Sequence, residues 1–187
     1  MKTRFALLLL SISLLRITST QAQEGFEFPQ PTAEHDWLKQ FEGTWTTASK
    51  ATAGPDQPPF ECTGTITSEM LGGFWVRNEM RGKVGEMNMH GAQTIGYDSE
   101  RQKYIGTWVD NTNGHMWRYT GSVDDSGKVL TLQAEGPSMI APGTTAQFQD
   151  IYEFKSADEM VITSKMQTPD GEWVTFMTGT ARRTKAE

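Results

Sequence analysis

Alternation of polar and apolar residues dominates the chain from residue 43 onward. Threonine, valine, isoleucine and aromatic residues are frequent in the alternating runs, and glycine, aspartate, asparagine and proline interrupt them at short intervals. A period of two residues is typical of strands with one buried and one exposed face. The pattern predicts about ten strands, at residues 43–50, 60–70, 74–82, 86–98, 103–111, 115–124, 129–136, 147–156, 159–167 and 172–183.

The connections between these runs predict how the strands pair. Several are short and rich in turn-forming residues, as at 111–114 and 169–171. Parallel strands need crossovers of about a dozen residues or more, so the sheet should be antiparallel. A barrel and a sandwich both satisfy this, and hairpins between neighbours favour the barrel, which has no exposed edges. We therefore predict an all-β fold, an antiparallel up-and-down β-barrel.

One short helix is predicted just before the first strand. Thr32 can cap its N-terminus, Trp37, Leu38 and Phe41 share one face, and Gly43 is a natural stop. About two turns of helix fit into this segment. The apolar face predicts that the helix plugs one end of the barrel.

Residues 1–22 have the three parts of a secretory signal peptide. Two basic residues come first and an apolar run follows over 5–15. The segment ends in Thr20, Gln21 and Ala22, which fit the small–x–small pattern of a cleavage site. The apolar run is about half as long as a membrane-spanning helix requires, which disfavours a retained anchor. We expect cleavage after Ala22 and export to the periplasm or the medium.

The predicted organisation is a signal peptide at 1–22, an extended arm at 23–34 and a single β-barrel domain at 35–187. Loss of the three basic residues of the signal lowers the formal charge from −6 to −9. An acidic domain without a basic run argues against nucleic acid as a partner, and against a membrane after signal cleavage. The single cysteine, Cys62, excludes an intrachain disulfide and is expected to be a buried thiol.

Residues at the two ends of the predicted barrel resemble a known pattern. Gly43 and Trp45 open the first strand, and Arg182 and Arg183 close the last. This is similar to the calycin (lipocalin-like) barrels, in which a tryptophan early in the first strand packs near an arginine late in the last. The resemblance implies such packing here, and small-molecule binding by analogy of fold.

A closer resemblance covers residues 35 to 183. It rests on 35–38, 41–45, 71–74, 96–98, Tyr104, 108–110 and the terminal arginine, which together resemble the bacterial family called domain of unknown function 1579. That family implies a calycin-like barrel and no particular activity.

Several short motifs bear on metal, cofactor or catalytic chemistry. None of the three histidines has zinc-ligand spacing, and no glycine motif has phosphate-binding spacing, so neither a metal nor a cofactor is expected. Met87, Met89 and His90 contain soft to borderline ligands for Cu(I). On a strand, however, both methionines point one way and His90 the other, which favours methionines that face the interior. Glu79 and Asp110 are acids on central strands and could serve an enzyme if buried.

Aromatic and methionine side chains are the main resource for a binding site. The favoured function is a non-catalytic binding barrel for a small apolar or amphiphilic molecule; the alternatives are a filled structural or protein-interaction module and an enzyme with an acid in the cavity. On 104–110 both faces contain apolar residues, so the inward set stays open. The candidate cavity lining is Asn78, Met80, Met87, Met89, Trp108, Asp110 and Tyr152.

Overall fold

The computed structural model describes residues 27–54 and 57–184. The chain divides into two units, 1–30 and 31–187. The predicted signal peptide and the first part of the predicted arm lie outside the described residues, and 27–30 form neither helix nor strand. Within the described ranges, no helix is long and apolar enough to cross a membrane.

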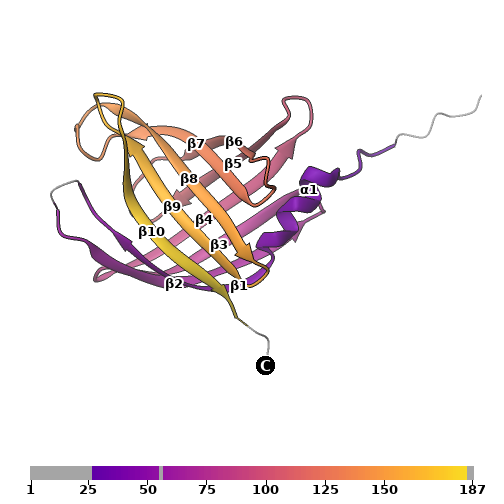
Figure 1. Ribbon diagram of the computed structural model, residues 1–187, viewed down its shortest axis with the longest axis horizontal. Helices are drawn as coiled ribbons and strands as arrows, with labels where there is room; N and C mark the ends of the chain where they lie inside the picture. Colours follow the sequence, from indigo (N-terminus) through magenta and orange to yellow (C-terminus); the bar gives the residue numbers. More distant parts are fainter. Residues whose placement is uncertain (1–26, 55–56, 185–187) are drawn as a thin grey trace, which may run out of the picture. The chain divides into compact units, whose positions relative to one another are not determined.

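The second unit is a closed antiparallel barrel of ten strands (Figure 1). Each strand pairs with its neighbours in sequence, and the first strand pairs with the last. This confirms the predicted up-and-down barrel, and every strand end lies within two residues of its predicted position. The strands are β1 (Gly43–Ala51), β2 (Phe60–Leu71), β3 (Trp75–Val84), β4 (Met87–Asp98), β5 (Lys103–Asp110), β6 (Trp117–Val123), β7 (Val129–Pro137), β8 (Thr145–Ser156), β9 (Glu159–Gln167) and β10 (Trp173–Arg183).

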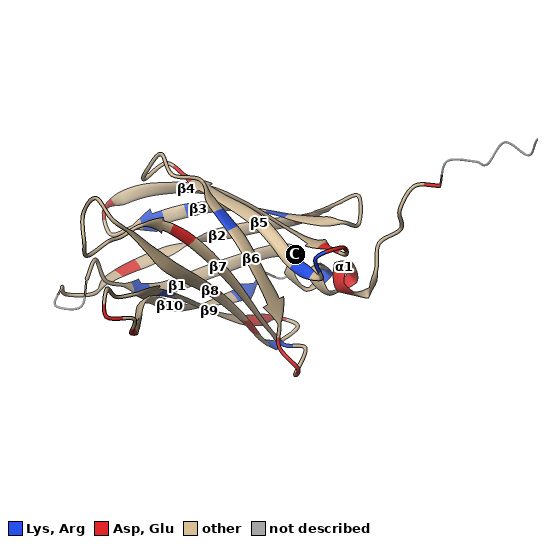
Figure 2. Ribbon diagram, turned by 90° about the horizontal axis from the view of Figure 1, so that it is seen from above, with Lys and Arg blue, Asp and Glu red and all other residues tan. Residues whose placement is uncertain are grey.

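Alternation along the strands separates the interior from the outer surface. On β7, Leu130, Leu132 and Ala134 are buried, and the residues between them are more exposed. On β5, Tyr104 is buried and Val109 is exposed, which identifies the inward face that the sequence left open. Figure 2 shows basic and acidic residues interspersed along the strands and turns.

A short helical segment closes one end of the barrel, as predicted. It consists of α1 (Ala33–Trp37) and a 3₁₀ turn over Leu38–Phe41. The backbone N–H of Thr32 donates to Nδ1 of His35 at 3.0 Å, which caps the first turn. Leu38 and Phe41 are buried. The Nε1–H of Trp37 donates to the backbone oxygen of Gly127 in the β6–β7 turn at 2.8 Å. This hydrogen bond also attaches the helical segment to the rim of the barrel.

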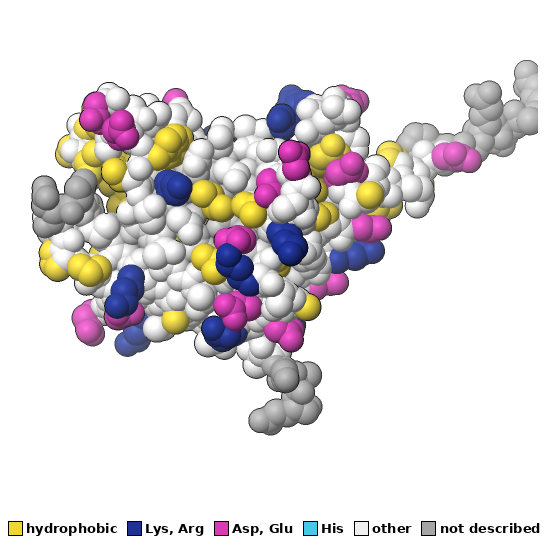
Figure 3. Space-filling view, viewed as in Figure 1, with side chains coloured by type: hydrophobic (Ala, Val, Ile, Leu, Met, Phe, Trp, Pro, Cys, Tyr) yellow, Lys and Arg dark blue, Asp and Glu magenta, His cyan; other side chains and the backbone are white. Residues whose placement is uncertain are grey.

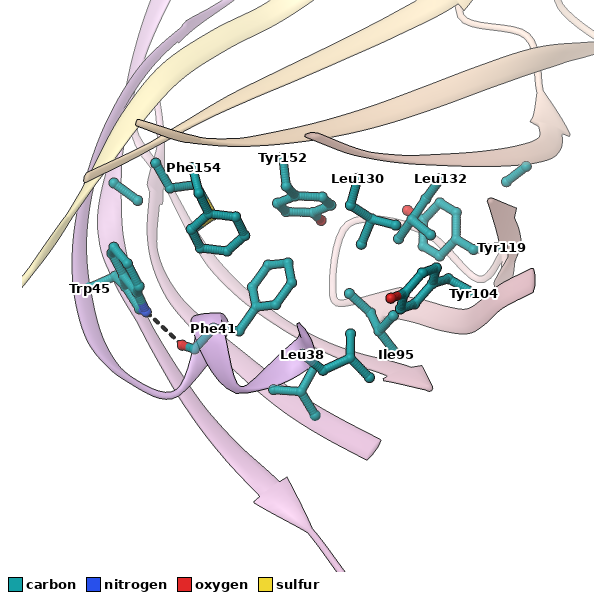
Figure 4. Packing of buried hydrophobic residues seen from close by; sticks show 14 residues of the cluster. Leu38, Phe41, Trp45, Ile95, Tyr104, Tyr119, Leu130, Leu132, Tyr152 and Phe154 are labelled. Carbon is teal, nitrogen blue, oxygen red and sulfur yellow. Dashed lines mark hydrogen bonds between the residues drawn. The ribbon is translucent and has the colours of Figure 1, made fainter. Parts of the chain in front are cut away.

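The hydrophobic core lies against this segment (Figure 4). Phe41 packs edge to face against Tyr152 and Phe154, with ring centroids 5.3 and 5.0 Å apart. Such aromatic pairs are favourable beyond the apolar area they bury. The core is therefore concentrated in the half of the barrel nearest α1.

The residues of the calycin-like signature meet where the helical segment joins β1. Gly43 has a φ of +107°, a conformation that favours glycine. The Nε1–H of Trp45 donates to the backbone oxygen of Phe41 at 2.7 Å (Figure 4). The guanidinium of Arg183 lies over the Trp45 ring, 4.1 Å from its centroid.

Arg183 also binds the end of the helical segment, whereas Arg182 does not. The Arg183 guanidinium donates to the backbone oxygens of Gln40, at 3.0 Å, and of Glu42. Arg182 points to the outer surface and pairs with Glu159 at 2.7 Å. The register explains this difference, because neighbours on a strand face opposite sides of the sheet.

Candidate functional site

A cavity of about 530 Å³ occupies the barrel between the helical segment and the loops at the opposite end. Its lining begins at Phe41 and reaches Asn113 in the β5–β6 loop and Met139 in the β7–β8 loop. Both loop residues are exposed, so the cavity opens at this end. Figure 3 shows apolar side chains at the surface there. Cavities of roughly 300–1,000 Å³ are typical of small-molecule sites.

Two tryptophans form much of the apolar wall. A Cβ at Gly91 would lie 2.3 Å from the ring of Trp108, and a Cβ at Gly136 would lie 2.3 Å from the ring of Trp117. Both rings therefore pack against backbone at positions that only glycine allows. Trp117 also packs edge to face against Phe148, with centroids 4.7 Å apart. Other apolar lining residues are Met80, Met89, Met160, Ile162, Phe176 and Met177.

A chain of hydrogen bonds crosses the cavity wall from β3 to β8. Asn78 donates through Nδ2 to Oε1 of Gln93 at 2.8 Å, and Gln93 donates through Nε2 to the Tyr152 hydroxyl at 2.9 Å. Burial raises the pKa of Tyr152, and the nearby Asp150 raises it further, so this phenol stays protonated at neutral pH. These neutral groups fix one another's positions.

Asp150 is an acid on the inner face of β8 and lines the cavity. Its carboxylate accepts hydrogen bonds from the Tyr119 hydroxyl and from the Ser164 Oγ, both at 2.5 Å. Burial raises the pKa of Asp150, and the two hydrogen bonds partly oppose that shift. Burial, followed by the Asp150 charge, raises the pKa of Tyr119.

Asp110 is a second acid on the wall, closer to the mouth. Its Oδ2 accepts from Nε1 of Trp108 at 2.7 Å, and its Oδ1 accepts from both the backbone N–H, at 2.7 Å, and the hydroxyl of Thr112. Hydrogen bonds to a carboxylate are stronger than those between neutral groups. The acid thus fixes the Trp108 ring and the start of the β5–β6 loop.

The structure brings six of the seven candidate lining residues together. Asn78, Met80, Met89, Trp108, Asp110 and Tyr152 line the cavity; whether they contact a ligand stays a prediction. The seventh, Met87, does not line it and is 46% exposed. Met87 has the same alternation as Met89, but it is the first residue of β4, next to the β3–β4 turn, where its side chain is exposed. The prediction for Met87 was wrong for that reason.

Glu79 and His90 lie on the outer surface. Nε2 of His90 is 3.1 Å from Oε1 of Glu79, which also accepts from Arg81, and these side chains are exposed. Hydrogen bonds from Arg81 and His90 lower the pKa of Glu79. The hypothesis of Glu79 as an acid in the cavity is therefore wrong.

Cys62 is 4% exposed and lies on the cavity wall. Burial raises the pKa of its thiol. Across the described part of the chain, no group of three or more histidine, cysteine or acidic side chains is placed to hold a metal ion.

Sequence reasoning missed Asp150, Gln93 and Ser164. Each has a signal in the alternation. Asp150, for example, falls on the same face of its strand as the buried Phe148 and Tyr152. A polar residue at an inward position was the sign to look for.

The fold and the site define the class of this protein, a closed ten-stranded antiparallel barrel with an internal cavity that opens at one end. The chain belongs to the family described as "Protein of unknown function (DUF1579)", which matches residues 30–183. This confirms the family resemblance seen in the sequence; membership of the calycin superfamily stays a prediction. No curated protein matches the chain.

Several solved structures are similar to this chain. Rv2717c from M. tuberculosis is similar over 83% of this chain and 100% of its own, with a TM-score of 0.59 and 13% identity. A de novo designed fluorescence-activating β-barrel is similar over 80% of this chain and 98% of its own, with a TM-score of 0.43 and 15% identity. The barrel EF1p2_mFAP2b, bound to DFHBI, covers 81% and 100%, with a TM-score of 0.45 and 9% identity. At these identities the likeness concerns the fold alone.

Proposed function

We propose that this protein binds a small apolar or amphiphilic molecule inside the barrel. The observation behind the proposal is the cavity of about 530 Å³ whose lining reaches exposed loop residues. Protein interiors are normally packed with few voids larger than a water molecule, so a filled structural barrel would not have this space.

The composition of the wall supports an apolar ligand held in one orientation. Trp108, Trp117 and several methionines offer apolar surface, and burial of such surface stabilises a complex by roughly 25 cal/mol per Å² before the costs of association. Several polar groups on the wall are positioned by hydrogen bonds to one another, as between Gln93 and Tyr152. Sites of this kind, mostly apolar with a small number of fixed polar groups, are typical of small-molecule pockets.

The experiment is a titration of the purified barrel with Nile red, an uncharged apolar dye, followed by dye emission. Two neighbouring threonines on β1 provide a matched pair of variants. Thr47 is buried on the cavity wall and Thr46 is exposed on the outer face. Thr47→Phe should weaken saturable dye binding by filling the cavity, and Thr46→Phe should not. Absence of saturable binding at micromolar dye, or equal effects of the two variants, would contradict the proposal.

We also propose that the protein is exported and that residues 1–22 are removed. The basic start, the apolar run and the small residues before Ala22 support this. Mass analysis of protein recovered from the periplasm or medium of the host should give an N-terminus at Gln23. Recovery of chains that all begin at Met1 would refute it.

A further inference from the structure

The cavity wall contains acidic side chains but no basic ones among the residues that the structure describes. The described residues that line it include two aspartates, Asp110 and Asp150, and no lysine, arginine or histidine. The described basic side chains that form ion pairs do so away from the cavity, as Arg182 does with Glu159. A ligand inside the barrel therefore meets carboxyl groups without any opposing cation.

Two groups on the wall can accept further hydrogen bonds. Each oxygen of Asp150 accepts one hydrogen bond, and an ionised carboxylate can accept about four in total. Asn78 belongs to the same wall, and its Oδ1 is buried without a hydrogen-bond partner among the described residues. Acceptors of this kind are satisfied by N–H or O–H donors.

An anionic ligand would be penalised twice in this environment. Transfer of a carboxylate from water into an apolar cavity is unfavourable unless a cation or several donors receive it. Here the ionisable groups nearest the ligand include the carboxyl groups of Asp110 and Asp150, and an ionised carboxylate repels an anion more strongly in the low dielectric of an interior than in water. An ammonium group suffers the same loss of hydration but gains an opposite charge and charge-assisted hydrogen bonds.

We propose that the ligand of this barrel is an apolar molecule with an amine head group, which binds at Asp150, and that fatty acids and other apolar carboxylates are excluded. This deepens the proposed function and rests on it. The cavity has room for the apolar part of such a ligand, because Asp150 lies inside the barrel and the lining continues over Trp117 and Phe148 to Met139 at the mouth.

The test compares three probes that share one alkyl chain and differ in the head group: dodecylamine, dodecanol and dodecanoate, each below its critical micelle concentration. Displacement of Nile red from the wild-type protein at neutral pH measures their relative affinities. We expect the amine to bind at least about tenfold more tightly than the carboxylate, with the alcohol between them. Equal or tighter binding of dodecanoate would overturn the inference and leave the binding function intact, whereas failure of Nile red and all three probes to bind would overturn both.

A pair of variants then locates the effect. Asp150→Asn removes the charge with little change of shape, and Asp125→Asn makes the same change at an exposed position in the β6–β7 turn. The first should reduce the preference for the amine over the carboxylate by about tenfold and the second should leave it unchanged. Folding of both is checked by circular dichroism, and the wild-type comparison decides the ligand class even if Asp150→Asn fails to fold. An unchanged preference in folded Asp150→Asn would refute the role of this carboxyl group.

Discussion

Replacement of Arg183 by methionine would separate the helical segment from the barrel wall. The guanidinium lies over the Trp45 ring and donates to the backbone oxygens of Gln40, Glu42 and Ala157. Two of these oxygens belong to the end of the 3₁₀ turn, where carbonyl groups have no partner within the helix. Methionine keeps an apolar stem of similar length against Trp45 and removes the charge and all of these donors.

The expected loss of stability follows from these contacts. A cation over an aromatic ring is worth about 0.5–2 kcal/mol, depending on desolvation. A hydrogen bond to a charged group is worth about 1.5–3 kcal/mol net when it is buried. The Arg183 side chain is 27% exposed, so water replaces part of what is lost. We expect Arg183→Met to lower the free energy of unfolding by about 2–4 kcal/mol.

The control is the neighbouring arginine. Arg182 is 66% exposed and pairs with Glu159 at the surface, so Arg182→Met should cost under about 1 kcal/mol. Urea unfolding of both variants and the parent, followed by tryptophan fluorescence and by circular dichroism, gives the two values. Equal losses for the two arginines would refute the idea that Arg183 joins the helical segment to the barrel.

Three further predictions concern the interior. Gly91→Ala would place a Cβ 2.3 Å from the Trp108 ring; it should cost about 1–3 kcal/mol and weaken Nile red binding, whereas Gly114→Ala, with no atom within 4 Å, should do neither. Burial raises the pKa of Asp150, so its protonation stabilises the native state fully below the unfolded pKa of about 3.9, and this stabilisation is lost as pH rises through the folded-state pKa. The urea midpoint of Asp150→Asn should therefore gain on that of the parent as pH rises from about 4 through the folded-state pKa of Asp150, and a constant difference would contradict this. Leu38→Ala should cost about 2–5 kcal/mol in urea unfolding, because Leu38 is fully buried; a loss under about 1 kcal/mol would show that the plug is dispensable.

The barrel itself was predictable because its determinants are local. Alternation identifies each strand, and short turns force neighbours to pair antiparallel. The helical segment was predictable for the same reason, since Leu38 and Phe41 lie on one face of a single turn and both are buried. His35 is buried as well, packed edge to face against Phe74 at 5.1 Å, and nothing in its local sequence distinguishes it from an exposed capping residue.

The site was only partly predictable because it depends on where each strand begins relative to its neighbours. Alternation assigns Met87 and Met89 to one face, but Met89 lines the cavity, whereas Met87 at the start of β4 is exposed and does not. Asp150 depends on register, since Tyr119 and Ser164 reach it from two other strands.

Whether the barrel is open or filled depends on how its largest side chains are oriented. A tryptophan that projected toward the axis would occupy the space of a ligand. Trp108 and Trp117 instead pack against Gly91 and Gly136, at positions where any Cβ would meet the ring. Each glycine lies on a strand next to that of its tryptophan, so this pairing becomes apparent only once the sheet is assembled. The same two glycines that would weaken an isolated strand thus keep the wall thin and the centre of this barrel free for a ligand.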